Sequence, residues 1–243
     1  EQWRVGNVFL AGDAAHQTPP FFGQGMCHGF RDAVNLSWKL DLVLKGLSPD
    51  SLLDTYQTER DPHVRAVINA AVDAGRYICM LDPEQAAQRD AMIREKVKRN
   101  ELPTTAADLI PPVRNGLVAS GTTKAGARFI QPWVELDGER KLLDDVTDGQ
   151  WRLLVNSQRL SKSNQTLLSA LQQQIDIQAT LLTDLECDAL STWLADADAQ
   201  AVLLRPDHYV FGTATESSLG ELLNTLANQL FSSSPLTSQE AAQ

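Results

Sequence analysis

The sequence predicts an α/β protein in two parts, and two observations support that prediction. First, a short apolar run from Val8 to Ala11 has the length of a buried strand, and helical spacing of apolar residues follows after a turn. Second, short apolar runs and amphipathic stretches alternate from about residue 128, in the order β-α-β-α-β-β-α. Residues 100–127, which contain several Pro, Gly, Ser and Thr without clear periodicity, are expected to connect the two parts.

Composition narrows the classes of function. The 243 residues, 43% of them hydrophobic, can form one large core or two smaller ones. A net charge of −10 argues against nucleic acid or an anionic membrane surface as a partner, and no apolar run is long enough to span a bilayer. Cys27, Cys79 and Cys187 are scattered and form no CxxC, so neither a disulfide framework nor a metal site is indicated and a reducing cytoplasm is expected.

The turn after the first apolar run has the features of a ligand site. Gly12 frees the backbone, and Asp13 stands at the carboxyl end of the predicted strand, the edge at which open α/β sheets place ligands. Pro19-Pro20 then makes a stiff extended segment. Gly23-Gln24-Gly25 lets main-chain N–H groups approach a ligand closely, just before a helix begins. This combination predicts a site for an electron-rich, partly anionic planar ligand.

The stretch GDAAHQTPPFFGQGMCHGFRDAVNLSWKL, residues 12–40, resembles the second flavin-contacting motif of the FAD-dependent aromatic hydroxylases. These are group A flavoprotein monooxygenases of the phenol hydroxylase and 3-(3-hydroxyphenyl)propionate hydroxylase type. LLDTYQTERDPHVRAV, residues 52–67, resembles the segment that follows in that family. The resemblance implies that residues 1–99 are the C-terminal part of an FAD-binding domain, GR2-type and Rossmann-like, with long helices. The implied reaction is hydroxylation of a phenolic substrate with O2 and NADH or NADPH, through a flavin C4a-hydroperoxide.

The resemblance also implies roles for individual residues. Asp13 would accept hydrogen bonds from the ribityl hydroxyls, and Pro20 would lie beside the reactive edge of the isoalloxazine as the catalytic position. Phe21 and Phe22 would present apolar surface to the aromatic substrate, with packing in the core as the alternative. The implied cofactor-binding residues are Gly12, Asp13, Pro20, Gly23, Gln24, Gly25, Met26 and Cys27. Two positions depart from the family pattern: Phe22 where many relatives have a small residue, and Cys27 where Asn is common.

Polar residues around this motif receive structural interpretations. His16 could touch the ligand, but a hydrogen-bonded turn histidine is the favoured interpretation. Arg31, Asp32 and Asn35 are expected to fix the helix against its neighbours and to take no part in the chemistry.

Three helices are expected in the first part. The first spans residues 25–46 and ends at Gly46 in a C′ position. The second follows Ser48-Pro49-Asp50, is kinked or restarted at Pro62, and reaches about Tyr77.

Arg60 and His63, on the second helix, are expected on a solvated, ion-paired face. The third helix, from Pro83 to about Lys98, is mostly polar and is expected on the surface.

The second part, residues 128–231, has the element order of thioredoxin. AVLLRPDHYVFG, residues 201–212, resembles the end of the thioredoxin-like domain found in many phenol-hydroxylase-type enzymes. A redox-active thioredoxin needs CxxC where its first helix begins, but the corresponding NSQRLSKSN, residues 156–164, contains no cysteine. The domain is therefore assigned a structural role or an oligomer contact, with a homodimer as one arrangement. The polar tail, residues 232–243, is expected to be disordered.

Two functions of different classes remain open. No strand-linked GxGxxG occurs, so the expectation is the C-terminal portion of an aromatic hydroxylase that is incomplete and inactive by itself. The alternative is a non-catalytic fragment that acts as a thioredoxin-like interaction module. A flavin halogenase or epoxidase is a weaker third interpretation. Yellow cofactor bound to the purified chain would separate the first two.

Overall fold

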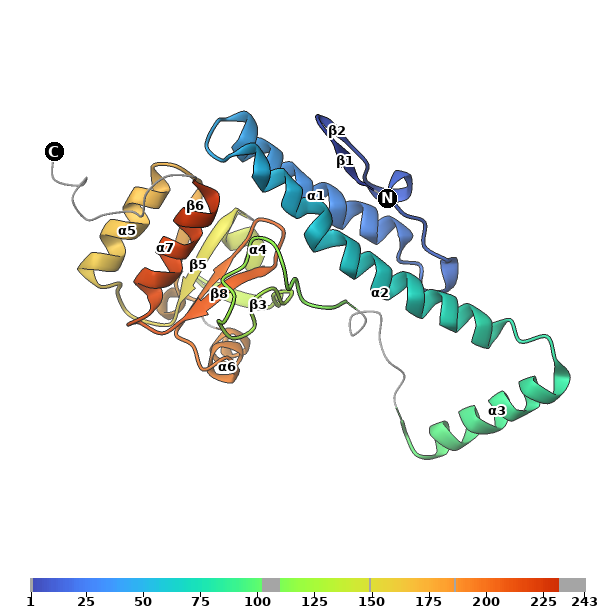
Figure 1. The fold of residues 1–243 in the computed structure, drawn as a ribbon. Coiled ribbons are helices and arrows are strands. Elements are labelled where there is room, and N and C mark those ends of the chain that lie inside the picture. Colours follow the sequence, from blue (N-terminus) through green and yellow to red (C-terminus); the bar gives the residue numbers. More distant parts are fainter. Residues whose placement is uncertain (1, 102–109, 149, 186, 232–243) are drawn as a thin grey trace. The chain divides into compact units, whose positions relative to one another are not determined.

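The computed structural model describes residues 2–101, 110–148, 150–185 and 187–231 (Figure 1). The chain forms two compact units, one of Glu1–Ala33 with Arg60–Pro111 and the other of Val34–Glu59 with Pro112–Gln243. The tail expected to be disordered and part of the expected connection, residues 102–109, lie outside the described residues.

The first unit begins with a small hairpin. β1 (Arg4–Val5) pairs antiparallel with β2 (Val8–Phe9). The expected buried strand is therefore shorter than its apolar run, and Val8 is 67% exposed. Within the described residues this two-residue strand pairs only with β1, which leaves Val8 uncovered, so the expectation of a buried strand was wrong. Two 3₁₀ turns follow, η1 (Gly12–Ala14) and η2 (Pro20–Phe22).

Helix α1 (Gly25–Leu44) begins and ends close to the predicted residues. Gly46 adopts a φ of +71°, which suits glycine, and its N–H donates to Val43 O at 2.9 Å. The N–H of Leu47 reaches back to Leu42 O at 2.9 Å. The predicted C-terminal glycine is confirmed.

Helix α2 (Thr55–Ile78) follows a short 3₁₀ turn, η3 (Asp50–Asp54). Of the two expected effects of Pro62, a kink or a restart, the restart was wrong, because the helix runs through Pro62 without interruption. Pro62 cannot donate a backbone hydrogen bond within the helix. Val64 and Val67 are each 1% exposed, and their burial stabilises the helix enough to offset that missing bond.

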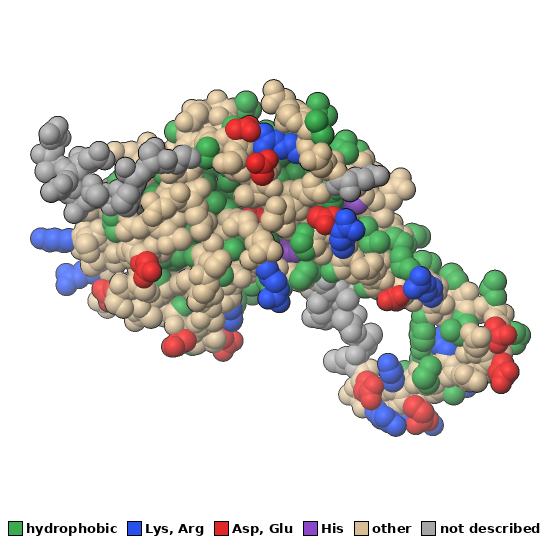
Figure 2. All heavy atoms as spheres, viewed as in Figure 1, with side chains coloured by type: hydrophobic (Ala, Val, Ile, Leu, Met, Phe, Trp, Pro, Cys, Tyr) green, Lys and Arg blue, Asp and Glu red, His purple; other side chains and the backbone are tan. Residues whose placement is uncertain are grey.

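Helix α3 (Pro83–Lys98) has the predicted bounds, with the Asp82 carboxylate accepting from Gln85 N–H at 2.9 Å. None of its residues is buried. Acidic, basic and hydrophobic side chains are intermixed along it in Figure 2. The prediction of a surface helix is confirmed.

The second unit contains a four-stranded sheet in the order β6-β5-β7-β8. β5 and β6 are parallel, whereas β7 pairs antiparallel with both β5 and β8. The strands are β5 (Trp151–Val155), β6 (Ile177–Leu181), β7 (Ala201–Leu204) and β8 (Val210–Ala214). The helices are α5 (Lys162–Gln172), α6 (Asp188–Asp196) and α7 (Leu219–Leu230). These strands and helices follow one another in the predicted order, β-α-β-α-β-β-α.

A second hairpin was not predicted. β3 (Trp133–Leu136) and β4 (Glu139–Leu142) pair antiparallel and lead into the short helix α4 (Leu143–Val146). Asp137-Gly138, with φ values of +53° and +77°, makes the turn. Asp-Gly is a favoured pair for a two-residue hairpin turn, so the sequence contained a local signal for this hairpin.

The sheet separates two hydrophobic clusters, because successive strand residues point to opposite faces. Leu153, Leu203 and Phe211 belong to the cluster that includes α5 and α7, which lie side by side in Figure 1. Leu154 and Leu204 belong to the cluster that includes α6. Within the described residues, no helix is both long and apolar enough to cross a membrane.

Candidate functional site

The turn that carries Asp13 lies close against α1. Gly12 has a φ of +56°, and a Cβ built on it would be 3.6 Å from the Cα of Gly29. A side chain on Gly12 would therefore be strained by its φ. The turn holds no buried residue, and Asp13 is exposed. The carboxylate is available to a ligand.

The N-terminus of α1 supplies hydrogen-bond donors close by in the sequence. Gly23, with a φ of +62°, ends the η2 turn, and α1 begins at Gly25. The N–H of His28 donates to Gln24 O at 3.0 Å, so the earlier N–H groups of Gly25–Cys27 lie in the first turn, where no carbonyl of the helix can reach them. These groups and the helix dipole favour a negatively charged or electron-rich ligand.

The two phenylalanines occupy an intermediate environment. Phe21 is 38% exposed, and a Cβ built on Gly75 of α2 would lie 2.2 Å from its Cε2 atom, so one side of the ring packs on that glycine. Phe22 is half-buried, whereas Pro20 is exposed. Phe21 thus combines partial packing with an accessible surface, which leaves both sequence interpretations of the residue open.

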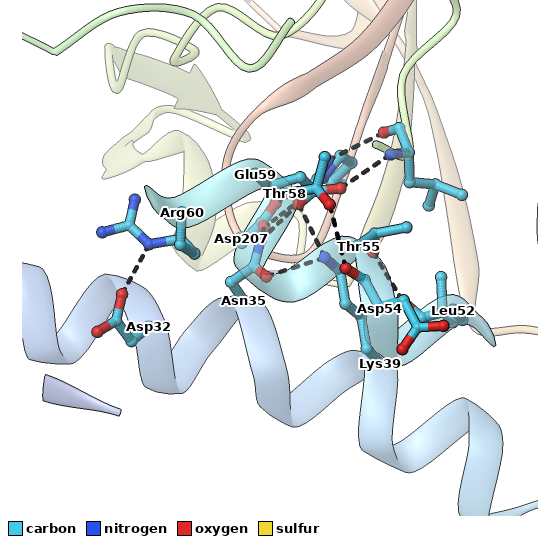
Figure 3. A network of polar contacts seen from close by, with 12 residues as sticks. Asp32, Asn35, Lys39, Leu52, Asp54, Thr55, Thr58, Glu59, Arg60 and Asp207 are labelled. Atoms are coloured by element: carbon cyan, nitrogen blue, oxygen red, sulfur yellow. Dashed lines mark hydrogen bonds and ion pairs between the residues drawn. The ribbon is translucent and has the colours of Figure 1, made fainter. Parts of the chain in front are cut away.

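Asp32 of α1 connects this turn to α2. Its side chain is fully buried, and Oδ2 accepts from the N–H of Gly12 at 3.0 Å and from His16 Nε2 at 2.6 Å. Oδ1 accepts from Arg60 Nε at 2.8 Å, the pair drawn in Figure 3. His16 is therefore a hydrogen-bonded histidine beside the turn, as expected, and Asp32 fixes the helix against its neighbours.

The expectation of a solvated face for Arg60 and His63 was wrong. Each is 1% exposed, and Arg60 Nη1 lies 3.1 Å from His63 Nδ1. Arg60 Nη2 lies 3.4 Å from His28 Nδ1. Helical charge patterns do not reveal burial, because the long Arg side chain reaches a carboxylate 28 positions away in the sequence. Three of the four histidines, His16, His28 and His63, belong to this cluster.

Burial, together with neighbouring positive charges, keeps His28 neutral by lowering its pKa. Burial, followed by the nearby Arg60 and Arg31, lowers the pKa of His28 from 6.5 to about 4. His28 is therefore neutral at pH 7, and its Nδ1 can accept from Arg60. Within the described residues, no group of at least three His, Cys, Asp or Glu side chains has an arrangement that could hold a metal ion.

A second buried network lies in the unit that contains the sheet. Glu59 of α2 accepts from Lys39 Nζ at 2.8 Å and from Arg205 Nη2 at 2.5 Å. Arg205, which follows β7, also donates twice to Asp207, at 2.9 and 2.6 Å. Asn35 Nδ2 joins Glu59 to Asp207, at 2.8 Å from each carboxylate (Figure 3). These contacts connect α1 and α2 to the β7–β8 hairpin.

The charges of this network balance. Burial alone would raise the pKa of Glu59, but attraction to Arg205 and Lys39 outweighs burial and lowers that pKa to about 2. Burial lowers the pKa of Lys39 to about 8, although Glu59 opposes the shift. Burial also acts against the charge of Arg205, yet Asp207 and Glu59 raise its pKa. Removing one member would leave an uncompensated buried charge.

No sequence pattern predicted that Lys39, Glu59, Arg205 and Asp207 form a group. Glu59 and Arg205 are 146 positions apart, and no local pattern predicts such a pair. A partial signal existed in Arg205-Pro206-Asp207, a charged tight turn between two apolar strands.

Comparisons with known proteins show which families the chain is similar to. A family described as FAD binding domain matches residues 1–71, and a family described as HcaD C-terminal domain matches residues 126–229. The chain is 37% identical over 227 residues to a probable NADH-specific resorcinol 4-hydroxylase of Rhodococcus jostii (strain RHA1), covering 89% of this chain and 42% of that protein. It is 32% identical over 255 residues to a 3-(3-hydroxy-phenyl)propionate/3-hydroxycinnamic acid hydroxylase of Escherichia coli O157:H7, covering 94% and 46%.

The chain is a relative of FAD-dependent aromatic hydroxylases. It spans less than half the length of these curated relatives. Among solved structures, OxyS anhydrotetracycline hydroxylase from Streptomyces rimosus matches with a TM-score of 0.72 and 27% identity, covering 93% of this chain and 45% of that one. The flavin-dependent monooxygenase PieE, solved with FAD and substrate, matches with a TM-score of 0.71 and 25% identity, covering 93% and 48%.

The residues present fit the isoalloxazine and ribityl half of FAD. An exposed carboxylate at Asp13 suits hydroxyl donors, and the N–H groups of Gly25–Cys27 suit an electronegative ring edge. The comparisons favour the hydroxylase interpretation of the sequence over that of a non-catalytic module.

Proposed function

We propose that this chain is the C-terminal portion of an FAD- and NADH-dependent monooxygenase that hydroxylates a phenolic substrate with O2. The observation that supports this most is the exposed Asp13 on a turn held against α1, followed in sequence by the helix N-terminus. Similarity to a resorcinol 4-hydroxylase and to a 3-(3-hydroxy-phenyl)propionate hydroxylase supports a phenolic substrate, and the NADH-specific description of the first supports NADH as the reductant. FAD supplies the oxygen-activating chemistry when bound.

In this proposal, individual residues of the chain bind the flavin and orient the substrate. Asp13 accepts hydrogen bonds from the ribityl hydroxyls, and the N–H groups of Gly25–Cys27 meet the electronegative edge of the flavin ring. Pro20, an exposed residue without an N–H, presents a rigid apolar surface beside that ring. Phe21 and Phe22 extend the apolar surface toward the aromatic substrate, which excludes water and limits the substrate's orientations. The flanking Gly12, Gly23, Gln24 and Met26 shape the same cofactor site.

The second unit has a structural role in the proposal. Its sheet order and the parallel β5–β6 pair support a thioredoxin-like fold, and residues 156–164 contain no cysteine. The three cysteines have free thiols, which is consistent with a protein that functions in the reducing cytoplasm. A homodimer through this unit remains part of the proposal.

The full-length protein provides the test. We expect it to purify with FAD and to oxidise NADH faster when resorcinol or a 3-hydroxyphenyl acid is added, with an oxygenated product found by mass spectrometry. Asp13→Ala should weaken FAD binding about tenfold or more, because a charge-assisted hydrogen bond contributes about 1.5–3 kcal/mol.

Asp41→Asn is the matched control for that variant, since Asp41 pairs only with the exposed Lys45 among the described contacts. A full-length protein that holds no FAD and oxygenates none of these phenols would contradict the proposed function.

A further inference from the structure

Asp32 holds the Asp13 turn at two points. One carboxylate oxygen accepts both from the N–H of Gly12, where the turn begins, and from His16, just after it ends. The N–H of His16 also donates to Gly12 O at 3.0 Å, so these two points are connected to each other. The turn that carries Asp13 is thereby held at both ends by a single carboxylate oxygen of Asp32.

Little else buries the turn. None of the residues Gly12–Ala14 is buried, so apolar packing contributes little to its position. The Trp3 and His16 rings lie 5.3 Å apart between centroids, so Trp3 packs beside the His16 ring. The polar contact of His16 Nε2 is made with Asp32. The hydrogen bonds to Asp32 therefore have a large share in fixing the geometry of the turn.

Arg60 offsets the free-energy cost of burying the Asp32 carboxylate. A fully buried carboxylate without a countercharge is costly, and Arg60 of α2 supplies the countercharge at 2.8 Å. Arg60 in turn contacts His28 and His63, which orient its guanidinium. The carboxylate is thus held in place by α2 as well as by its own helix.

We propose that Asp32 is a positioning residue for the flavin, which acts by holding the Gly12–Ala14 turn through Gly12 and His16 so that Asp13 meets the cofactor. This inference rests on the proposed function and goes beyond it, because it assigns a role to Asp32 and His16, two residues to which the proposed function gives none. His16 is the partner on the turn, and the role requires its Nε2 donor rather than its charge.

The first experiment compares His16→Ala with His16→Gln in the full-length protein. His16→Ala removes the donor and leaves the Asp32–Arg60 pair intact, whereas the amide of Gln can still donate to Asp32. We expect His16→Ala to weaken FAD binding by the apoprotein about tenfold, and His16→Gln to restore it to within about threefold of wild type. Fluorescence titration with FAD measures both.

A second readout needs no cofactor. Amide hydrogen exchange in the apoprotein, over a peptide that includes residues 12–16, should be faster in His16→Ala and Asp32→Asn than in wild type. Melting temperatures of the apoproteins separate this local effect from unfolding, which matters because Asp32→Asn leaves Arg60 without its carboxylate. Asp41→Asn, on the same helix, is the control and should change neither exchange nor affinity.

The outcomes distinguish the two proposals. Wild-type FAD affinity in both His16→Ala and Asp32→Asn would overturn the positioning role and leave the hydroxylase function standing. Unchanged exchange at the turn in His16→Ala would overturn the positioning role whether or not FAD binds. Equal losses of affinity in His16→Ala and His16→Gln would also overturn it, because the donor would then be irrelevant.

Discussion

At the scale of single residues, Phe21 tests whether the turn before α1 contributes to the substrate site. Its ring packs on Gly75, and the residue is still 38% exposed. Removing the ring therefore takes away accessible apolar surface more than it takes away core packing. We expect Phe21→Ala in the full-length enzyme to raise uncoupling, with NADH oxidised and H2O2 released faster than phenol is hydroxylated. The ratio of product formed to NADH consumed measures this effect.

Stability provides the comparison for Phe21. Deleting a fully buried phenylalanine costs about 3–5 kcal/mol, and we expect a smaller loss for this half-packed ring. A large fall in melting temperature with coupling intact would assign Phe21 to the core and remove it from the site.

The buried His28 predicts a dependence of stability on pH. Its pKa of about 4 in the folded protein lies below its ordinary 6.5, so the folded state binds fewer protons than the unfolded state between those values. The contribution of neutral His28 to the free energy of unfolding is fully present above pH 6.5. It is lost as the pH falls toward 4, at up to about 1.4 kcal/mol per pH unit.

Urea unfolding of wild type and His28→Gln at pH 7 and pH 5 tests this linkage. We expect the free energy of unfolding of wild type to fall by about 1–2 kcal/mol more than that of the variant. The carboxylates titrate in both proteins, so their contribution cancels in the difference. Equal losses in the two proteins would show that His28 is not responsible.

At the scale of secondary-structure elements, Glu59 connects two helices to a hairpin of the sheet unit. Its carboxylate receives Lys39 from α1, Arg205 from the end of β7, and the N–H of Leu117 at 2.8 Å. We expect Glu59→Gln to lower the free energy of unfolding by about 3–5 kcal/mol, because two buried cations lose their shared anion. Chemical denaturation of the full-length protein measures it.

Asp73→Asn is the control on the same helix. Asp73 pairs with Arg76 at the surface, where both side chains are more than 70% exposed, and such pairs contribute little. We expect that variant to stay within about 0.5 kcal/mol of wild type. A Glu59→Gln protein as stable as Asp73→Asn would contradict the importance of the network.

At the scale of the whole molecule, the proposed site residues would contact only the isoalloxazine and ribityl half of FAD. Its sequence has no strand-linked GxGxxG, the motif that binds a dinucleotide pyrophosphate at a helix N-terminus. We therefore expect the 243-residue chain alone to bind FAD at least about tenfold more weakly than the full-length protein, since fewer contacts must offset the cost of ordering the ligand. Stoichiometric FAD that survives gel filtration of the 243-residue chain would refute this expectation.

The sequence by itself determined most of the local structure and the family. Gly46 ends α1 because its backbone adopts a positive φ, and Asp82 begins α3 by accepting a backbone N–H, both of which are local effects. The apolar runs of β5 and β7 and the helical spacing of α7 are also local signals. The resemblance of residues 12–40 to a flavin motif needed only the order of residue types.

Only the tertiary structure decided which charged residues are buried. Arg60 looks like an exposed helix residue in the sequence, yet it is the countercharge of Asp32. Glu59, next to it, belongs to a different network with Arg205. Burial depends on which distant segments pack together, and long-range partners leave no periodic trace in the sequence. The same reason explains why the short β1–β2 hairpin could not be distinguished from a buried strand by its apolar residues alone.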